Sequence, residues 1–151
     1  MVCQRPAARD LGGRQETTMK KELDEALCHD FPLLYADRNE SMKQSLMCFG
    51  FEVGDGWYGI IHELSEKLEA MIAAQPADKQ HLFRALQVKE KFGTLRFYMT
   101  ASTDEMNSAI SHAEQLSAVT CADCGLPAQQ EPRSGWWSTL CDRCAEDRDK
   151  R

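Results

Sequence analysis

Three stretches of the chain repeat apolar side chains at helical spacing. One begins at Met19, the second runs from Trp57 to Pro76, and the third follows residues 102–105, whose sequence Ser-Thr-Asp-Glu forms a capping box. The second stretch is the longest and predicts the main core helix. Its apolar positions are Trp57, Ile60, Ile61, Leu64, Leu68, Met71 and Ile72.

Strands are predicted in two places. Residues 45–53 (SLMCFGFEV) are a short apolar run that ends at the turn formers of residues 54–56, Gly-Asp-Gly, and they predict one strand. Residues 87–99 (QVKEKFGTLRFYM) predict a hairpin, because a continuous strand would mix lysines with apolar side chains on each face. A type II′ turn at residues 93–94 would pair Phe92 with Leu95. The apolar face would then hold Val88, Phe92, Leu95, Phe97 and Met99, interrupted by Glu90.

The opposite face of this hairpin is predicted to collect three cations and one aromatic ring. They are Lys89, Lys91, Arg96 and Tyr98. Antiparallel sheets commonly expose one polar face, so these residues can serve solubility alone. Alternatively, they can bind phosphate and a stacked base, or an acidic partner protein. They are the main candidate partner-binding residues.

Four cysteines near the C-terminus follow the pattern C-x2-C-x16-C-x2-C. They are Cys121, Cys124, Cys141 and Cys144. This spacing is typical of a tetrahedral zinc site, and a closed four-thiolate shell leaves no ligand position for water or substrate. We therefore predict structural Zn²⁺ in a treble-clef-like finger or a zinc ribbon. A redox role is disfavoured, because a thioredoxin-like site needs one pair at a strand–helix junction.

The other cysteines and the paired tryptophans carry weaker signals. The chain has seven cysteines, an odd number in a sequence without an export signal, which disfavours a disulfide framework. Cys3, Cys28 and Cys48 are interpreted as small apolar fillers or incidental surface thiols. Trp136 and Trp137 are adjacent on a predicted strand and must point opposite ways. We expect one to pack over the metal site and the other to be exposed as a partner anchor.

Composition fits one ordinary soluble domain with a small metal-bound appendage. The chain has 151 residues, of which 42% are hydrophobic and 28% charged. The sequence predicts an α+β domain over residues 19–118, preceded by a disordered tail at 1–18 and followed by the four-cysteine finger at 119–151. The formal net charge of −6 repels polyanions, so any nucleic-acid contact would need a local basic patch. No apolar run approaches the length of a membrane span, which favours a cytoplasmic location.

Candidate catalytic residues are scattered. His29, His62 with Glu63, His81 and His112 form no motif in which a nucleophile, a base and an orienting group would meet. The glycines around residues 50–56 could form an anion-binding loop, but Glu52 and Asp55 would place negative charge where a phosphate would bind. We therefore predict a protein without enzymatic activity.

Two long phrases resemble a known group of proteins. Residues 48–61 (CFGFEVGDGWYGII) and 87–99 (QVKEKFGTLRFYM), followed by CADCG and TLCDRC, are similar to small proteins encoded by tailed phages and prophages. The resemblance spans roughly residues 40–145 and comes with no established activity. It implies an accessory phage protein that acts inside a bacterial host cell and binds host machinery or defence systems.

Together these observations predict a binding protein that engages a host protein complex. One variant is that its acidic surface imitates DNA in the groove of a host nuclease. The alternative is direct nucleic-acid binding through the basic hairpin face.

Overall fold

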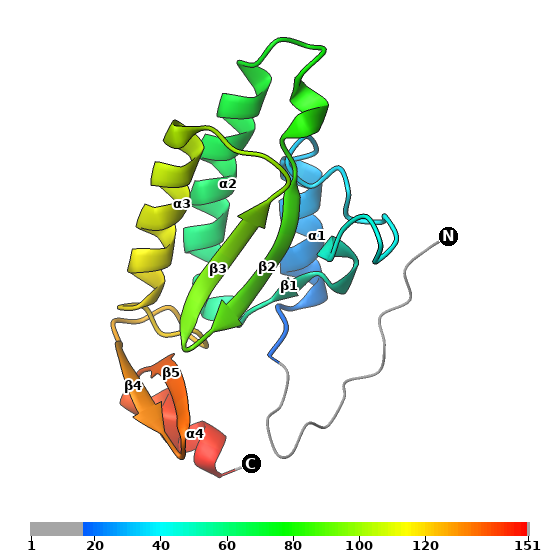
Figure 1. Ribbon diagram of the computed structural model, residues 1–151. Helices are drawn as coiled ribbons and strands as arrows, with labels where there is room; N and C mark the ends of the chain where they lie inside the picture. Colours follow the sequence, from blue (N-terminus) through cyan, green and yellow to red (C-terminus); the bar gives the residue numbers. More distant parts are fainter. Residues whose placement is uncertain (1–16, 151) are drawn as a thin grey trace.

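The computed structural model describes residues 17–150 (Figure 1). Residues 1–16, which make up most of the predicted tail and include Cys3, lie outside the described residues. Thr17 and Thr18 have no regular secondary structure. The Met19 amide donates to the Phe51 carbonyl at 3.0 Å, and the Met19 side chain is buried, so the core begins at this residue.

The larger sheet has three strands and mixed topology. Its order is β1 (Phe51–Glu52), β2 (Ala85–Lys91) and β3 (Thr94–Met99). The predicted hairpin is the antiparallel pair β2 and β3, while β1 runs parallel to β2. The fold class is α+β, as the sequence predicted.

Helices cover one face of this sheet. They are α1 (Lys21–Asp30), α2 (Tyr58–Ala73) and α3 (Asp104–Ser117), and Figure 1 shows α2 and α3 side by side behind β2 and β3. Thr103 caps α3 by accepting the Met106 amide at 3.2 Å. The helix therefore starts one residue later than the predicted capping box requires, and Met106 rather than Glu105 occupies its third position. None of the described helices is long and apolar enough to cross a membrane.

The core lies between the helices and the apolar face of the sheet. Its largest fully buried side chains include those of Trp57 at the start of α2 and Phe51 on β1. On the sheet the core face is formed by Val88, Leu95 and Phe97. Ser117 Oγ and Glu114 Oε1 on α3 accept the Leu95 and Phe97 amides, so α3 also covers the outer edge of β3.

The predicted strand at residues 45–53 is mostly not a strand. Residues Met47–Phe49 form a 3-10 turn, and only Phe51–Glu52 pair with β2. Gly50 separates the two pieces, because its φ of 73° is incompatible with an extended chain. Ser45 Oγ also accepts the Met47 amide at 3.1 Å, which favours the turn locally.

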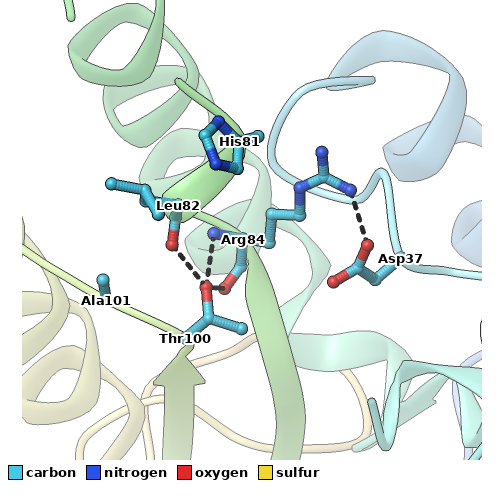
Figure 2. A pocket seen from close by; sticks show the side chains of 6 residues that line it. All are labelled: Asp37, His81, Leu82, Arg84, Thr100 and Ala101. Atoms are coloured by element: carbon cyan, nitrogen blue, oxygen red, sulfur yellow. Dashed lines mark hydrogen bonds and ion pairs between the residues drawn. The ribbon is translucent and has the colours of Figure 1, made fainter. Parts of the chain in front are cut away.

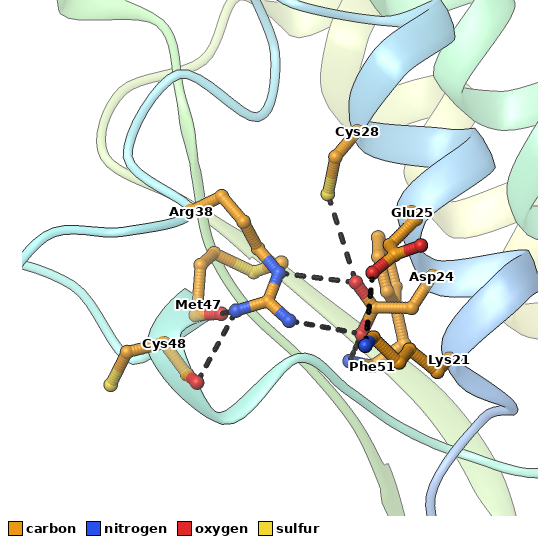
Figure 3. A network of polar contacts seen from close by, with 8 residues as sticks. All are labelled: Lys21, Asp24, Glu25, Cys28, Arg38, Met47, Cys48 and Phe51. Carbon is orange, nitrogen blue, oxygen red and sulfur yellow. Dashed lines mark hydrogen bonds and ion pairs between the residues drawn. The ribbon is translucent and has the colours of Figure 1, made fainter. Parts of the chain in front are cut away.

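A buried ion pair holds this irregular segment against α1 (Figure 3). Arg38 donates to both carboxylate oxygens of Asp24, at 3.1 and 3.2 Å, and its Nη1 donates to the carbonyls of Met47 and Cys48. Asp24 is buried and also accepts the Phe51 amide. The pair thus joins α1, the 3-10 turn and β1, and it binds carbonyls that a regular strand would have paired.

The hairpin turn lies one residue earlier than predicted. Lys91 pairs with Thr94, so the turn residues are Phe92 and Gly93, with φ values of 55° and 82°. These values belong to a type I′ turn, not the predicted type II′ turn at residues 93–94. The register shift moves Phe92 from the expected apolar face to the tip. Because the pairing moves by two positions in total, the other side chains keep their predicted faces.

The smaller sheet belongs to the C-terminal unit, which follows the end of α3. It is the hairpin of β4 (Gln129–Arg133) and β5 (Trp136–Leu140), with α4 (Asp142–Asp149) directly after it. Short 3-10 turns at Asp55–Trp57 and Gln80–Leu82 complete the fold. Ser134 and Gly135 form the turn between β4 and β5, with φ values of 50° and 84°.

Candidate metal centre

Four cysteine sulfurs converge at the C-terminal unit. The Sγ atoms of Cys121, Cys124, Cys141 and Cys144 all lie within 4.8 Å of one another. Those of Cys124 and Cys141 are 3.7 Å apart, close to the roughly 3.8 Å edge of a tetrahedron with 2.3 Å metal–sulfur bonds. All cysteines in the described part of the chain are free thiols. The four residues can therefore hold a metal ion of zinc's size and coordination.

A tight knuckle presents the first two sulfurs. The Gly125 amide donates to the Cys121 carbonyl at 2.9 Å, and the Cys121 amide donates to the Leu126 carbonyl at 2.7 Å. Gly125 has a φ of 80°, a conformation that glycine adopts without steric cost. These bonds fold residues 121–126 back on themselves and bring Cys121 and Cys124 to one side.

The second pair lies at the junction of strand and helix. Cys141 occupies the N-cap position of α4, and Cys144 lies in its first turn. Knuckle, hairpin and helix therefore follow one another in the order of a treble-clef finger, rather than as the two knuckles of a zinc ribbon. Arg148 on α4 donates to both carboxylate oxygens of Asp123 in the knuckle, at 2.8 and 2.5 Å, and so closes the unit.

Backbone amides favour the thiolate form of one ligand. Burial alone would raise the pKa of Cys121, but amides of Cys141, Cys124 and Asp123 donate toward its sulfur and lower the pKa to about 7. Burial raises the pKa of Cys144, and its hydrogen-bonded sulfur neighbours add to this effect. A Cys121 thiol that ionises readily, beside a Cys144 thiol that holds its proton more tightly, is a suitable starting point for a cation, whose charge draws the remaining protons off.

The knuckle rests on the loop that precedes α2. The Gly56 amide donates to the Ala122 carbonyl at 2.9 Å, and Trp57 Nε1 donates to the Thr120 carbonyl at 2.8 Å. A Cβ atom on Gly54 would lie 2.1 Å from the Ala122 carbonyl oxygen, and one on Gly56 would lie 2.2 Å from that of Cys121. Both glycines are thus needed for close approach of two backbones. This explains residues 54–56 without an anion-binding role.

The β4–β5 hairpin packs against the turn between β2 and β3. Thr139 Oγ1 donates to the Gly93 carbonyl, and Gln130 Nε2 donates to the Phe92 carbonyl, each at 2.6 Å. A Cβ atom on Gly93 would lie 2.9 Å from the Ser138 backbone. Sequence reasoning missed these contacts, although glycines within two distinctive motifs were a usable signal of close packing.

The predicted partner-binding residues of the sheet do share one face. Lys89 pairs with Arg96, Lys91 with Thr94 and Gln87 with Tyr98, so the three cations and the tyrosine alternate with the core-facing positions. Lys91 and Tyr98 are exposed, and Lys89 and Arg96 are half-buried. Arg96 also lies 3.9 Å from Glu114 of α3. We call Lys89, Lys91, Arg96 and Tyr98 the basic sheet face.

The expectation for the two tryptophans is wrong in one respect. Neither packs over the metal centre, since Trp136 is 55% exposed and Trp137 is 47% exposed. Trp136 pairs with Arg133 and Trp137 with Pro132 near the tip of the two-stranded sheet. The interior of the unit is filled by smaller side chains, those of Ala122, Leu140 and Ala145.

The scattered histidines lie on separate elements. His29 on α1 is exposed and contacts Asp30. His62 and Glu63 are on α2, where the His62 ring packs edge-on against Phe31. His112 is on α3. His81 borders an open depression of about 500 Å³ at the end of the sheet far from the cysteines (Figure 2). There Arg84 is held by Asp37 at 2.6 Å. The lining residues are Asp37, His81, Leu82, Arg84, Thr100 and Ala101.

Comparisons of the chain with protein-family models, with curated proteins and with solved structures find no match.

Proposed function

We propose that this chain is a non-enzymatic binding protein whose four cysteines hold one structural Zn²⁺. The observation that carries the proposal is the gathering of four sulfurs within 4.8 Å at a spacing that suits a tetrahedral ion. Tetrahedral sulfur sites favour zinc or iron, and zinc is the usual ion of a finger built from knuckle, hairpin and helix.

The placement of the metal argues for a structural role. Four thiolates complete a tetrahedron and leave no position for a substrate. The site also lies where the finger contacts the Gly54–Gly56 loop and the β2–β3 turn, so an ion there would hold three segments together. Structural zinc in small peptides contributes on the order of 10 kcal/mol of apparent folding free energy.

The partner we propose is a host protein or protein complex. Support comes from the resemblance to small phage and prophage proteins and from accessible side chains on and beside the finger. These are the basic sheet face, in which Lys91 and Tyr98 are exposed, together with Trp137 of β5. Aromatic and cationic side chains are the types enriched in protein interfaces. In this role the protein acts in the cytoplasm of a bacterial cell.

Affinity capture from a bacterial lysate tests this function. The bait is the metal-loaded chain, and the matched variant replaces Lys89, Lys91 and Arg96 with glutamate. A control variant replaces Lys43, Lys79 and Lys150, exposed lysines elsewhere on the surface, in the same way. We expect a host protein, identified by mass spectrometry, to be captured by the chain and the control and lost with the basic-face variant. Capture that survives the basic-face change would contradict the proposed surface.

Direct nucleic-acid binding is the second candidate, favoured by the cross-strand pairing that gathers three cations beside Tyr98. The two candidates differ in their response to salt. Affinity for single-stranded nucleic acid should fall steeply as salt rises, with a slope of about −0.7 for each neutralised phosphate. Binding to a protein interface with apolar anchors should respond far less.

A further inference from the structure

Phe92 occupies a turn position that disfavours large side chains. Its φ of 55° is a left-handed conformation in which a bulky side chain is strained, and type I′ turns prefer asparagine, aspartate or glycine there. The ring is 59% exposed, so it gains little from burial. Strain and exposure of a large apolar side chain at one residue point to a contact outside the chain.

A second exposed ring lies on the same side as this turn. Gln130 and Thr139 are cross-strand partners whose side chains bind the Phe92 and Gly93 carbonyls, so their face of the β4–β5 sheet is turned toward Phe92. Trp137 shares that face, because it lies two residues from Thr139. Trp136 projects from the opposite face.

Next to Phe92, positively charged side chains extend along one face of the larger sheet. The Lys91 ammonium lies 5.5 Å from the centre of the Phe92 ring, and the Lys89–Arg96 pair follows on the same face. Two acidic residues border this face: Glu52 lies beside Lys89 on β1, where it accepts a hydrogen bond from Gln87, and Glu114 of α3 lies 3.9 Å from Arg96. The face keeps a positive balance on a chain whose formal charge is −6.

We propose that Phe92, Trp137 and the basic sheet face form one docking surface for an acidic peptide segment that carries apolar side chains. The two rings take the apolar anchors, and Lys89, Lys91 and Arg96 take the carboxylates. This inference rests on the proposed protein-binding function and assigns its partner chemistry. The hydrogen bonds from Gln130 and Thr139 to the β2–β3 turn fix the finger, and with it Trp137, relative to Phe92, so the surface requires the metal-bound finger.

The layout favours a peptide over single-stranded nucleic acid. Proteins that bind single strands interleave stacking rings with cations along the whole track. Here the two large rings, those of Phe92 and Trp137, lie outside the cationic face, at the β2–β3 turn and on β5, and only Tyr98 lies within it. The overall negative charge also opposes a long polyanion more than a short acidic segment.

The test is a selection from a library of random displayed peptides on the zinc-loaded protein, followed by affinity measurements on the enriched sequences. We expect enrichment of peptides with net negative charge and aromatic or large aliphatic residues. Phe92→Asn and Trp137→Ala should each weaken their binding about tenfold or more, the effect of losing an interface anchor. Trp136→Ala, on the opposite face, is the matched control and should change the affinity much less.

Phe92→Asn separates a binding role from a structural one. Asparagine tolerates the left-handed conformation, so this variant should unfold at the same temperature as the parent chain or a higher one while losing peptide affinity. A lower melting temperature would make Phe92 structural and overturn the inference. So would enrichment of neutral or basic peptides, no enrichment at all, or a Trp136→Ala effect equal to that of Trp137→Ala.

Competition with oligothymidylate, a single-stranded DNA, tests the alternative of a nucleic-acid site. If it displaces the enriched peptides and binds more tightly at physiological salt, the surface is a nucleic-acid site and the inference fails. Host-protein capture that is lost in the basic-face variant but kept in Phe92→Asn and Trp137→Ala would leave the proposed function standing while this inference fails.

Discussion

The Gly56 amide and the Ala122 carbonyl are joined by a 2.9 Å hydrogen bond that links the start of the core helix to the cysteine knuckle. The next residue, Trp57, is fully buried and donates its indole N–H to the Thr120 carbonyl at 2.8 Å. The knuckle is therefore built onto the larger part of the chain rather than carried by a linker. Its stability and that of the α2 helix start should be coupled.

Replacing Gly56 with alanine tests this coupling. The new methyl group would lie 2.2 Å from the Cys121 carbonyl oxygen and 2.7 Å from the Gly125 nitrogen, both backbone atoms that cannot rotate away. We expect a loss of roughly 1–3 kcal/mol in unfolding free energy, as for other overpacked sites, and a weaker hold on the metal. Urea denaturation and competition with a chromogenic chelator measure the two effects.

Gly59→Ala is the matched control. Gly59 lies in α2 with no atom within 4 Å of the added Cβ, so alanine should stabilise the helix by about 0.5–1 kcal/mol and leave metal affinity unchanged. Equal effects of the two substitutions would show that the knuckle does not depend on contact with the residue 54–56 loop.

The Asp24–Arg38 pair should dominate the stability of the N-terminal half. Arg38→Met leaves the Asp24 carboxylate, 3% exposed, without its cation and frees two backbone carbonyls. Breaking one side of a buried pair costs roughly 3–5 kcal/mol. Lys67→Met, which removes a half-exposed pair with Glu63, should change stability by no more than about 0.5 kcal/mol. Denaturant titrations that give similar losses for both variants would refute the structural weight assigned to Arg38.

The unfolding free energy should fall at alkaline pH because the Cys28 thiol is buried. Burial, aided by the Asp24 carboxylate, raises the pKa of this thiol to about 12, whereas an unfolded thiol ionises near 8.5. The stability that the neutral thiol supports is therefore complete below pH ~8.5 and is lost as the pH rises toward 12. Between pH 8 and pH 10 the parent chain should lose roughly 1–2 kcal/mol more than Cys28→Ala. Parallel pH profiles of the two proteins would place Cys28 in contact with water.

Hydrophobic periodicity and residue spacing are sufficient to predict the elements that depend on local sequence. The α2 helix follows from its apolar repeat, the α3 start, within one residue, from its Ser-Thr-Asp-Glu sequence, and the cysteine cluster from its C-x2-C pairs. The basic sheet face was also predictable, because alternation along β2 and β3 does not change when the register shifts by two positions.

The errors fall where distant contacts decide local structure. Residues 45–53 look like a strand, but the Gly50 conformation and the Arg38 hydrogen bonds to Met47 and Cys48 keep most of them out of the sheet. The position of the β2–β3 turn depends on Gly93 fitting against the Ser138 backbone, a contact between segments far apart in the chain. The local sequence around Trp136 and Trp137 does not indicate whether another segment will cover their rings.

X-ray absorption at the zinc edge of the purified, reduced protein identifies the atoms that bind the metal. We expect one zinc per chain with four sulfur ligands at about 2.3 Å and no oxygen or nitrogen ligand. A Cys124→Ser variant should lose this signal, whereas Cys48→Ala, which alters a buried cysteine outside the cluster, should keep it. A metal-free protein, disulfides between the four cysteines, or a water ligand on the zinc would contradict a closed structural site.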